Sequence, residues 1–137
     1  MWELNKLNKT GAQLEISNKD RLHLNRAISV ARTSTERQRH GCVVVKGGRV
    51  ISVGVNTFRN HPLVVSQPDR NSSYHAEINA MRGIDLTGAT LYVARLGRNE
   101  LPSMSAPCVH CTSAIIKAGA KRIVWTVNEI EVGKILL

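Results

Sequence analysis

Two short motifs in this chain bring together side chains that can bind a metal ion and move protons. The first is His75-Ala76-Glu77, and the second is Pro107-Cys108-Val109-His110-Cys111. One imidazole and two thiolates suit a Zn²⁺ ion that keeps its fourth position open for water. We therefore predict a zinc site, one ion per chain, with His75, Cys108 and Cys111 as ligands. Glu77 is then free to take a proton from the bound water and return it later.

Both motifs fall where the sequence predicts the start of a helix. We expect one helix from about Tyr74 to Arg82, capped by Ser72 or Ser73, and another from Pro107 to about Ala118. A glycine follows each helix as a stop signal, and proline suits the first turn of the second helix. If the two helices pack side by side on a sheet, their N-termini can converge on one ion.

The two cysteines of the second motif lie at positions i and i+3, so they share one face of the predicted helix. The positive end of the helix dipole lowers the pKa of thiols at this place, which favours the thiolates that zinc requires. A thioredoxin-like redox pair is a weaker alternative. That motif follows the first strand of a βαβ unit, whereas the two cysteines here come late in the chain, after a loop. A closed structural zinc would need His110 or Cys42 as a fourth ligand, and neither is well placed for it.

The remaining pattern predicts an α/β protein. A helical stripe runs from about 19 to 34 with Asn18 as N-cap. Its apolar residues are Leu22, Ile28 and Ala31, with Leu24, Ala27 and Val30 between them. Strands are expected at 41–46, 49–55, 90–94 and 122–127, with long loops at 56–73 and 95–106, an edge strand near 13–17 and a last short strand at 130–132. Gly47-Gly48 predicts an antiparallel hairpin, and the later strand–helix–strand repeat predicts parallel pairing. The expected fold is a three-layer α-β-α sandwich with a mixed central sheet of four to five strands.

Composition limits the class of protein. A chain of 137 residues with 42% hydrophobic and 21% charged residues fits one domain, 1–137, with 1–18 as an N-terminal extension. No apolar run approaches 18 residues and the N-terminus lacks the apolar core of a signal peptide, so we expect no membrane segment and a cytoplasmic location. Cys42 reads as a buried strand thiol, and a disulfide framework is not expected. His23, His40 and His61 read as surface or loop residues rather than ligands.

The net charge of +9 favours an anionic partner, either a nucleotide phosphate or a polynucleotide. The basic residues are spread along the chain, so a merely soluble basic surface is the alternative. Aromatic residues make up only 4% of the chain, fewer than a sequence-tolerant single-strand binder usually shows.

The sequence resembles the cytidine deaminase superfamily over roughly residues 19–127, most closely the branch of deoxycytidylate and tRNA adenosine deaminases. The pattern H-x-E followed by P-C-x-x-C is the signature of zinc-dependent base deaminases. The resemblance implies that His75, Cys108 and Cys111 bind zinc and that Glu77 is the acid–base catalyst. It also implies a homo-oligomer, in which neighbouring subunits often complete the site.

Two further residues are assigned by the same resemblance. The family's second hairpin strand commonly ends in Gly-x-Asn, and Gly54-Val55-Asn56 matches it, so Asn56 is a candidate substrate-binding residue. The alternative for Asn56 is a turn residue that ends the strand. The backbone of Ala76 is the candidate for a contact with the base.

The chain also departs from its relatives. Gly-Tyr-Asn-Gly of allosteric deoxycytidylate deaminases reads Gly54-Val55-Asn56-Thr57 here, which argues against regulation by nucleoside triphosphates. Relatives usually add a helix and a parallel last strand after the strand at 122–127. The basic segment 95–98 lies where polynucleotide deaminases have a substrate loop.

Three functions remain open at this point. The first is deamination of a cytosine nucleoside or nucleotide, whose phosphate Arg59, Arg70 or Arg95 would hold. The second is deamination of cytosine or adenine in single-stranded DNA or RNA. The third is an inactive deaminase fold that serves as a binding module, which the presence of Glu77 argues against.

Overall fold

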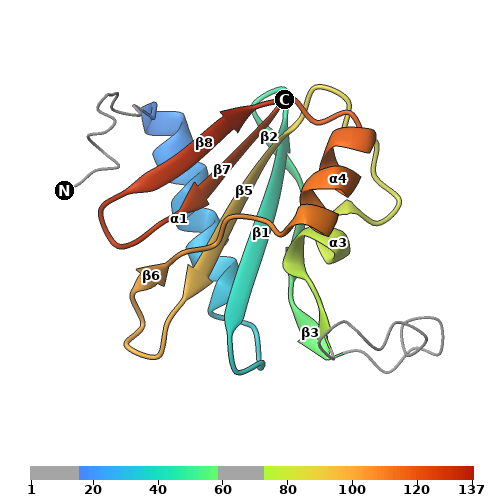
Figure 1. Cartoon of the computed structure of the whole chain (residues 1–137). Helices are drawn as coiled ribbons and strands as arrows, with labels where there is room; N and C mark the ends of the chain where they lie inside the picture. Colours follow the sequence, from blue (N-terminus) through green and yellow to red (C-terminus); the bar gives the residue numbers. More distant parts are fainter. Residues whose placement is uncertain (1–15, 59–72) are drawn as a thin grey trace.

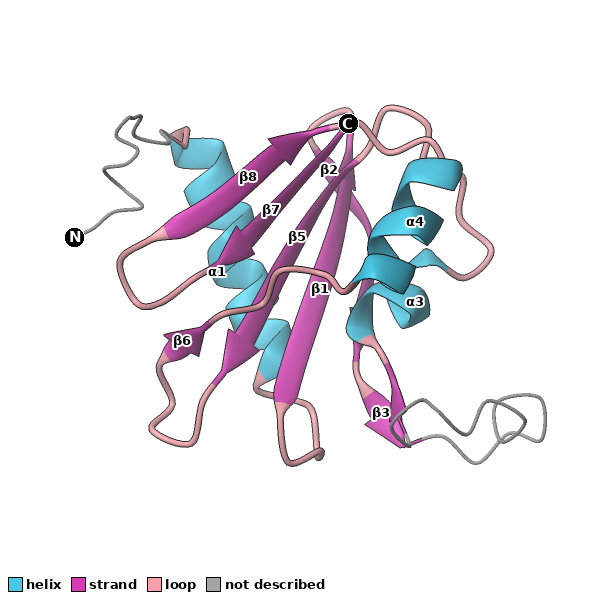
Figure 2. Cartoon of the chain, viewed as in Figure 1, coloured by secondary structure: helices cyan, strands magenta, loops and turns pink. Residues whose placement is uncertain are grey.

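Helices cover both faces of a central β-sheet in the computed structural model, which describes residues 16–58 and 73–137. Helix α1 (Asn18–Ala31) lies against one face, and α3 (Ala76–Met81) and α4 (Val109–Lys117) lie together on the other (Figures 1 and 2). The strands are β1 (Arg39–Lys46), β2 (Arg49–Val55), β3 (Thr57–Phe58), β4 (Ser73–Tyr74), β5 (Thr90–Leu96), β6 (Pro102–Ser103), β7 (Arg122–Thr126) and β8 (Val132–Leu136). This arrangement confirms the predicted three-layer fold.

The sheet is mixed, as the sequence predicts. Its strand order is β2-β1-β5-β7-β8, with β6 paired to the end of β5 and with β3 and β4 forming a separate pair. Strands β5 and β7 are parallel, and the other neighbours are antiparallel. Gly47 and Gly48 have φ values of 61° and 79°, the positive values that a type I′ hairpin turn requires. The β1–β2 hairpin is therefore confirmed.

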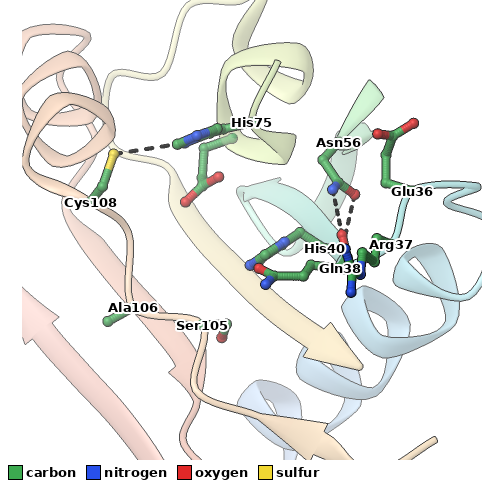
Figure 3. A pocket seen from close by; sticks show the side chains of 10 residues that line it. Glu36, Arg37, Gln38, His40, Asn56, His75, Ser105, Ala106 and Cys108 are labelled. Carbon is green, nitrogen blue, oxygen red and sulfur yellow. Dashed lines mark hydrogen bonds between the residues drawn. The ribbon is translucent and has the colours of Figure 1, made fainter. Parts of the chain in front are cut away.

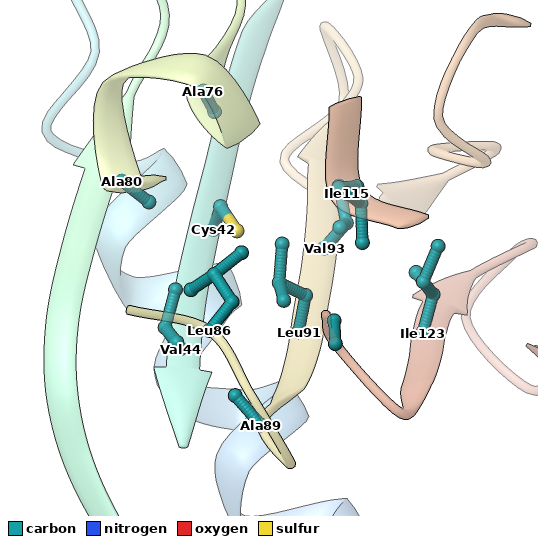
Figure 4. Close-up of a cluster of buried hydrophobic side chains, with 11 residues drawn as sticks. Cys42, Val44, Ala76, Ala80, Leu86, Ala89, Leu91, Val93, Ile115 and Ile123 are labelled. Atoms are coloured by element: carbon teal, nitrogen blue, oxygen red, sulfur yellow. The ribbon is translucent and has the colours of Figure 1, made fainter. Parts of the chain in front are cut away.

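Alternation along the central strands divides the core between the two faces of the sheet. Figure 4 shows the cluster on the side of α3 and α4. Cys42 and Val44 of β1 pack against α3 and α4. The alternating residues Val43 and Val45 pack against α1 on the other face. A strand with buried residues on both faces must be apolar throughout, which explains the uninterrupted run at 42–45. The free thiol of Cys42 is fully buried, as predicted.

The first helix is shorter than the sequence predicts, and Leu22 of its predicted apolar stripe is exposed. Its N-cap is Ser17 rather than Asn18, because the Ser17 hydroxyl accepts a hydrogen bond from the Asp20 amide at 3.0 Å. Leu22 is 49% exposed, and the side chains that face the sheet include Leu24 and Ala27. The helix ends at Ala31, before the polar run that leads into β1.

Segments predicted as loops contain extra pairing. Strand β5 runs on to Leu96, whose side chain is buried, and β6 turns back along it within the predicted loop 95–106. An ion pair of 2.6 Å between Arg39 and Glu100 holds this hairpin to β1. After β7, the chain turns at 127–131 and returns as antiparallel β8, later than the strand predicted at 130–132. In the predicted edge strand 13–17, residues 13–15 lie outside the described residues, and 16–17 belong to no regular element.

Among the described residues, no helix is both long and apolar enough to span a membrane.

A buried polar network ties α1 to the sheet on the face away from the metal motifs. Arg122 donates to both carboxylate oxygens of Asp20 at 2.8 and 3.0 Å, and the Tyr92 hydroxyl donates to the same carboxylate at 2.6 Å. These hydrogen bonds, that from Arg122 above all, lower the pKa of Asp20 from 3.8 to about 2. The ring of His23 lies beside Tyr92, with ring centroids 5.2 Å apart.

Acid titration should expose the contribution of this network to stability. Because the pKa of Asp20 is lower in the folded state, its contribution is complete above about pH 4 and is lost as the pH falls towards 2. The shift corresponds to about 2 kcal/mol in the free energy of unfolding. Urea unfolding between pH 2 and 6 should show this loss in the wild type and not in Asp20→Asn. Glu129→Gln, at an exposed position in the turn after β7, is the control and should keep the pH dependence. An unchanged pH dependence in Asp20→Asn would contradict the assignment.

Candidate active site

The starts of α3 and α4 place the two metal-binding motifs beside each other. His75 and Cys108 occupy the N-cap positions of these helices, and Cys111 lies in the first turn of α4. Neither helix is capped by a side chain, so the predicted caps Ser72 and Ser73 are wrong for α3. The side chains of His75 and Cys108 therefore do not cap their own helices.

The three side chains are close enough to share one ion. His75 Nδ1 lies 3.2 Å from Cys111 Sγ and 3.7 Å from Cys108 Sγ, and all three ligand atoms lie within 4.8 Å of one another. Tetrahedral zinc with ordinary bond lengths would separate such atoms by roughly 3.5–3.8 Å. The donor set and its spacing therefore fit zinc with three protein ligands and an open fourth position.

Glu77 lies on the first turn of α3, two residues beyond the histidine. Its side chain is only 4% exposed, and it lines the same pocket as His75 and Cys108. Burial raises the pKa of its carboxyl from 4.5 to about 7, because the charged form loses its solvation. A carboxyl with this pKa can both accept and release a proton near neutral pH.

A pocket of about 600 Å³ opens in front of these residues (Figure 3). Its volume is that of a typical small-molecule site. The metal-binding side chains lie on one side, and Glu36, Arg37 and Gln38 lie on the other. Other lining residues are His40, Asn56, Glu77, Ser105 and Ala106. The Ser105 hydroxyl is buried and bonds to the Val93 carbonyl at 2.9 Å, which fixes the segment leading to Cys108.

Asn56 lies where the sequence predicts it, at the end of β2 and at the edge of the pocket. Its side-chain oxygen accepts hydrogen bonds from Ser34 Oγ at 2.8 Å and from the His40 amide at 2.9 Å. Its side-chain nitrogen donates to the Gln38 carbonyl, which leaves one further N–H for a ligand. Ala76 is fully buried at the start of α3. Contacts of Asn56 and Ala76 with a substrate stay predictions.

Two of the histidines differ from their prediction as surface or loop residues. His23 is 5% exposed, because its ring packs beside the ring of Tyr92. His40 lines the pocket. Burial, with the charges of Arg95 and His75, lowers the pKa of His40 from 6.5 to about 4, so its ring is neutral at pH 7. His110 is exposed, and His61 lies outside the described residues.

The sequence contains one signal for His40 and none for Glu36 or Arg37. His40 lies two residues before the buried Cys42, so strand alternation places both on the same face of the sheet. Of the three arginines predicted to hold phosphate, Arg95 is described by the structure, and it is not among the described residues that line the pocket. Arg95 lies opposite His40 in β5, and its buried Nε has no hydrogen-bond partner among the described residues. Arg59 and Arg70 lie outside those residues.

The glycine two residues before Asn56 lets α3 approach β2 closely. A Cβ added to Gly54 would overlap the Ala80 amide and lie 2.7 Å from the Ala76 carbonyl oxygen, both backbone atoms that cannot rotate away. Gly54→Ala should therefore displace α3, which carries His75 and Glu77, and lower the melting temperature and zinc content together. Gly48→Ala at the hairpin turn is the control, since a Cβ there meets nothing within 4 Å and should not affect zinc. Normal zinc content in Gly54→Ala would show that α3 can shift without harm to the site.

Comparison with known proteins shows the family to which the chain belongs and agrees with its fold. Residues 17–127 match the family model described as the cytidine and deoxycytidylate deaminase zinc-binding region. The chain belongs to this family, as the resemblance predicts. No curated protein matched the chain at the threshold applied.

Solved structures show the same fold at low sequence identity. The dCMP deaminase of cyanophage S-TIM5 is 21% identical, with a TM-score of 0.57 over 79% of this chain and 82% of that one. The cytidine deaminase of Burkholderia pseudomallei is 16% identical, with a TM-score of 0.62 over 88% and 93%. RibD of Acinetobacter baumannii is 27% identical, with a TM-score of 0.53 over 77% of this chain and 27% of that one.

Proposed function

We propose that this protein is a zinc-dependent hydrolytic deaminase that converts a cytosine nucleoside or nucleotide to the uracil form and releases ammonia. Among these substrates we propose deoxycytidylate, because the similar dCMP deaminase of cyanophage S-TIM5 was solved in complex with dCMP and dUMP. The observation that carries the proposal is the convergence of His75, Cys108 and Cys111 beside the buried carboxyl of Glu77.

The proposed reaction divides the work between the metal and the chain. Zinc held by His75, Cys108 and Cys111 would lower the pKa of a bound water molecule and so supply a nucleophile for C4 of the base. Glu77 takes one proton from this water and delivers it to N3 of the ring. The water oxygen bonds to C4, and Glu77 moves the remaining proton of this oxygen to the exocyclic nitrogen. The C4–N bond then breaks, ammonia leaves, and the oxygen on C4 becomes the carbonyl of the uracil base. The buried position of Glu77 keeps bulk water from competing for these protons.

Ammonia release by the purified, zinc-loaded protein tests the proposal. The panel contains cytidine, deoxycytidine, their mono- and triphosphates, a cytosine-bearing single-stranded oligonucleotide and an adenine-bearing RNA hairpin. Turnover of a free nucleoside or nucleotide is the expected result. Turnover of only an oligonucleotide would instead identify a nucleic-acid deaminase, and its activity should fall steeply with salt. Zinc binding without turnover of any substrate would identify a binding module.

We also propose that the protein forms a homo-oligomer in solution. Apolar side chains are exposed on both edge strands and at the start of α4, where Val53, Leu136 and Val109 are 52%, 73% and 81% exposed. Such surfaces favour association with another chain. Sedimentation velocity should show a species larger than 15.1 kDa, and a monomer at micromolar concentration would refute this proposal.

A further inference from the structure

The segment between α1 and β1 forms the wall of the pocket that lies farthest from the metal-binding side chains. Glu36, Arg37 and Gln38 lie at this end in Figure 3, with Cys108 and His75 at the other. A base whose amino group reaches the metal-binding end would direct the rest of the substrate towards this wall. The chemistry of the wall therefore bears on what the base is attached to.

Hydrogen bonds hold the wall in place on both sides of Arg37. The Glu36 amide donates to Ser34 Oγ at 3.1 Å, and the same hydroxyl donates to Asn56. On the other side, Asn56 receives the hydrogen bond of the His40 amide and donates its own to the Gln38 carbonyl. The backbone on either side of Arg37 is thus anchored to β2, so this residue is presented to the pocket by a preorganised support.

Arg37 differs from its neighbour Arg39 in how its charge is used. Arg39 is paired with Glu100 at 2.6 Å and also donates to the Gly97 carbonyl at 3.3 Å. Within 16–58 and 73–137, the guanidinium of Arg37 makes neither a hydrogen bond nor an ion pair, and its side chain is exposed at the pocket. Its five N–H donors are available to a ligand, and their planar fork matches the oxygens of a phosphate.

We infer that Arg37 binds the 5′-phosphate of the substrate and makes this protein a deaminase of nucleoside monophosphates rather than of nucleosides. This inference rests on the proposed function and specifies its substrate class. The carboxylate of Glu36 lines the same end of the pocket and opposes an anion there. Removing it in Glu36→Gln should therefore tighten the binding of the monophosphate.

The test compares two substrates that differ only in the phosphate. The values of kcat/KM for dCMP and deoxycytidine are measured on the zinc-loaded full chain, for the wild type, Arg37→Gln, Arg37→Lys and Arg49→Gln. The wild type should prefer dCMP, and Arg37→Gln should lower the dCMP-to-deoxycytidine ratio about 10- to 100-fold, mainly through KM. Arg37→Lys should recover part of the ratio, because it keeps the charge and loses the fork. Arg49→Gln removes the same charge at the start of β2. This position lies beside Lys46, at the end of β1 that is far from Arg37, so the ratio should stay unchanged.

The outcomes separate this inference from the proposed function. An unchanged ratio in Arg37→Gln, or equal preference of the wild type for both substrates, would overturn the role of Arg37. If the wild type releases no ammonia from any cytosine compound, the proposed function fails, but calorimetric titration with dUMP and deoxyuridine still tests the site. Tighter binding of dUMP that disappears in Arg37→Gln supports the inference, and equal affinities of the two products overturn it.

Discussion

Glu77→Gln is expected to lower kcat about 10²- to 10⁴-fold while the zinc content stays at the wild-type level. Glutamine has nearly the same shape as glutamate and fits the same buried place on α3, but it cannot accept a proton from the attacking water. Because Glu77 is 4% exposed, solvent is poorly placed to take over the transfer. The loss should therefore appear in kcat rather than in substrate affinity.

The measurement combines steady-state ammonia release with metal analysis and circular dichroism on the same preparation. Glu129→Gln, at an exposed position in the turn after β7, is the matched control and should keep full activity. A Glu77→Gln variant with normal zinc and a kcat within a few-fold of wild type would show that another group moves the protons.

Loss of the metal should have an effect of similar size, and it should also destabilise the fold. Cys111 lies in the first turn of α4 and is 2% exposed. Its sulfur lies 3.2 Å from Nδ1 of His75, at the start of α3. A zinc ion bound here joins two helices that are far apart in sequence. Since zinc binds the folded state, a concentration 1,000-fold above the dissociation constant stabilises it by about 4 kcal/mol.

Cys111→Ser, or treatment of the wild type with a chelator, should abolish ammonia release and lower the melting temperature by several degrees. Cys42→Ala is the control, because it removes a buried thiol from β1 and should lose some stability but retain zinc. Activity in the wild type should return when zinc is added back after chelation. Full activity with less than 0.1 zinc per chain would rule out a catalytic metal.

The layered fold could be predicted because its signals are local. Cys42 to Val45 form an uninterrupted apolar run, Gly47-Gly48 dictates a tight turn, and Gly83 and Gly119 follow the helices with φ values of 67° and 94°. Each of these features depends on neighbours within a few residues. The boundaries of strands were predicted less accurately where residues far away in the sequence decide them. An example is β6, whose pairing with β5 is supported by the ion pair between Arg39 and Glu100.

The reaction centre could be predicted for a different reason. Zinc chemistry restricts the residue types, and the starts of α3 and α4 restrict their positions, so His75, Cys108 and Cys111 stand out within short stretches of sequence. The residues of the opposite pocket wall, between α1 and β1, form no such pattern in the sequence. Glu36 and Arg37 belong to the polar run after the predicted helix, and nothing in that run indicates that Asn56 will hold it against the pocket.

The sequence by itself determined the three layers, the β1–β2 hairpin, the parallel pairing of β5 with β7 and the candidate residues His75, Glu77, Cys108 and Cys111. Only the tertiary structure decided which remaining polar groups meet. It buried Asp20 with Arg122, placed His23 against Tyr92, and left Arg37 exposed at the pocket while committing Arg39 to Glu100. The physical reason is that local propensities are properties of short segments, whereas burial and ion pairing depend on side chains that come from anywhere in the chain.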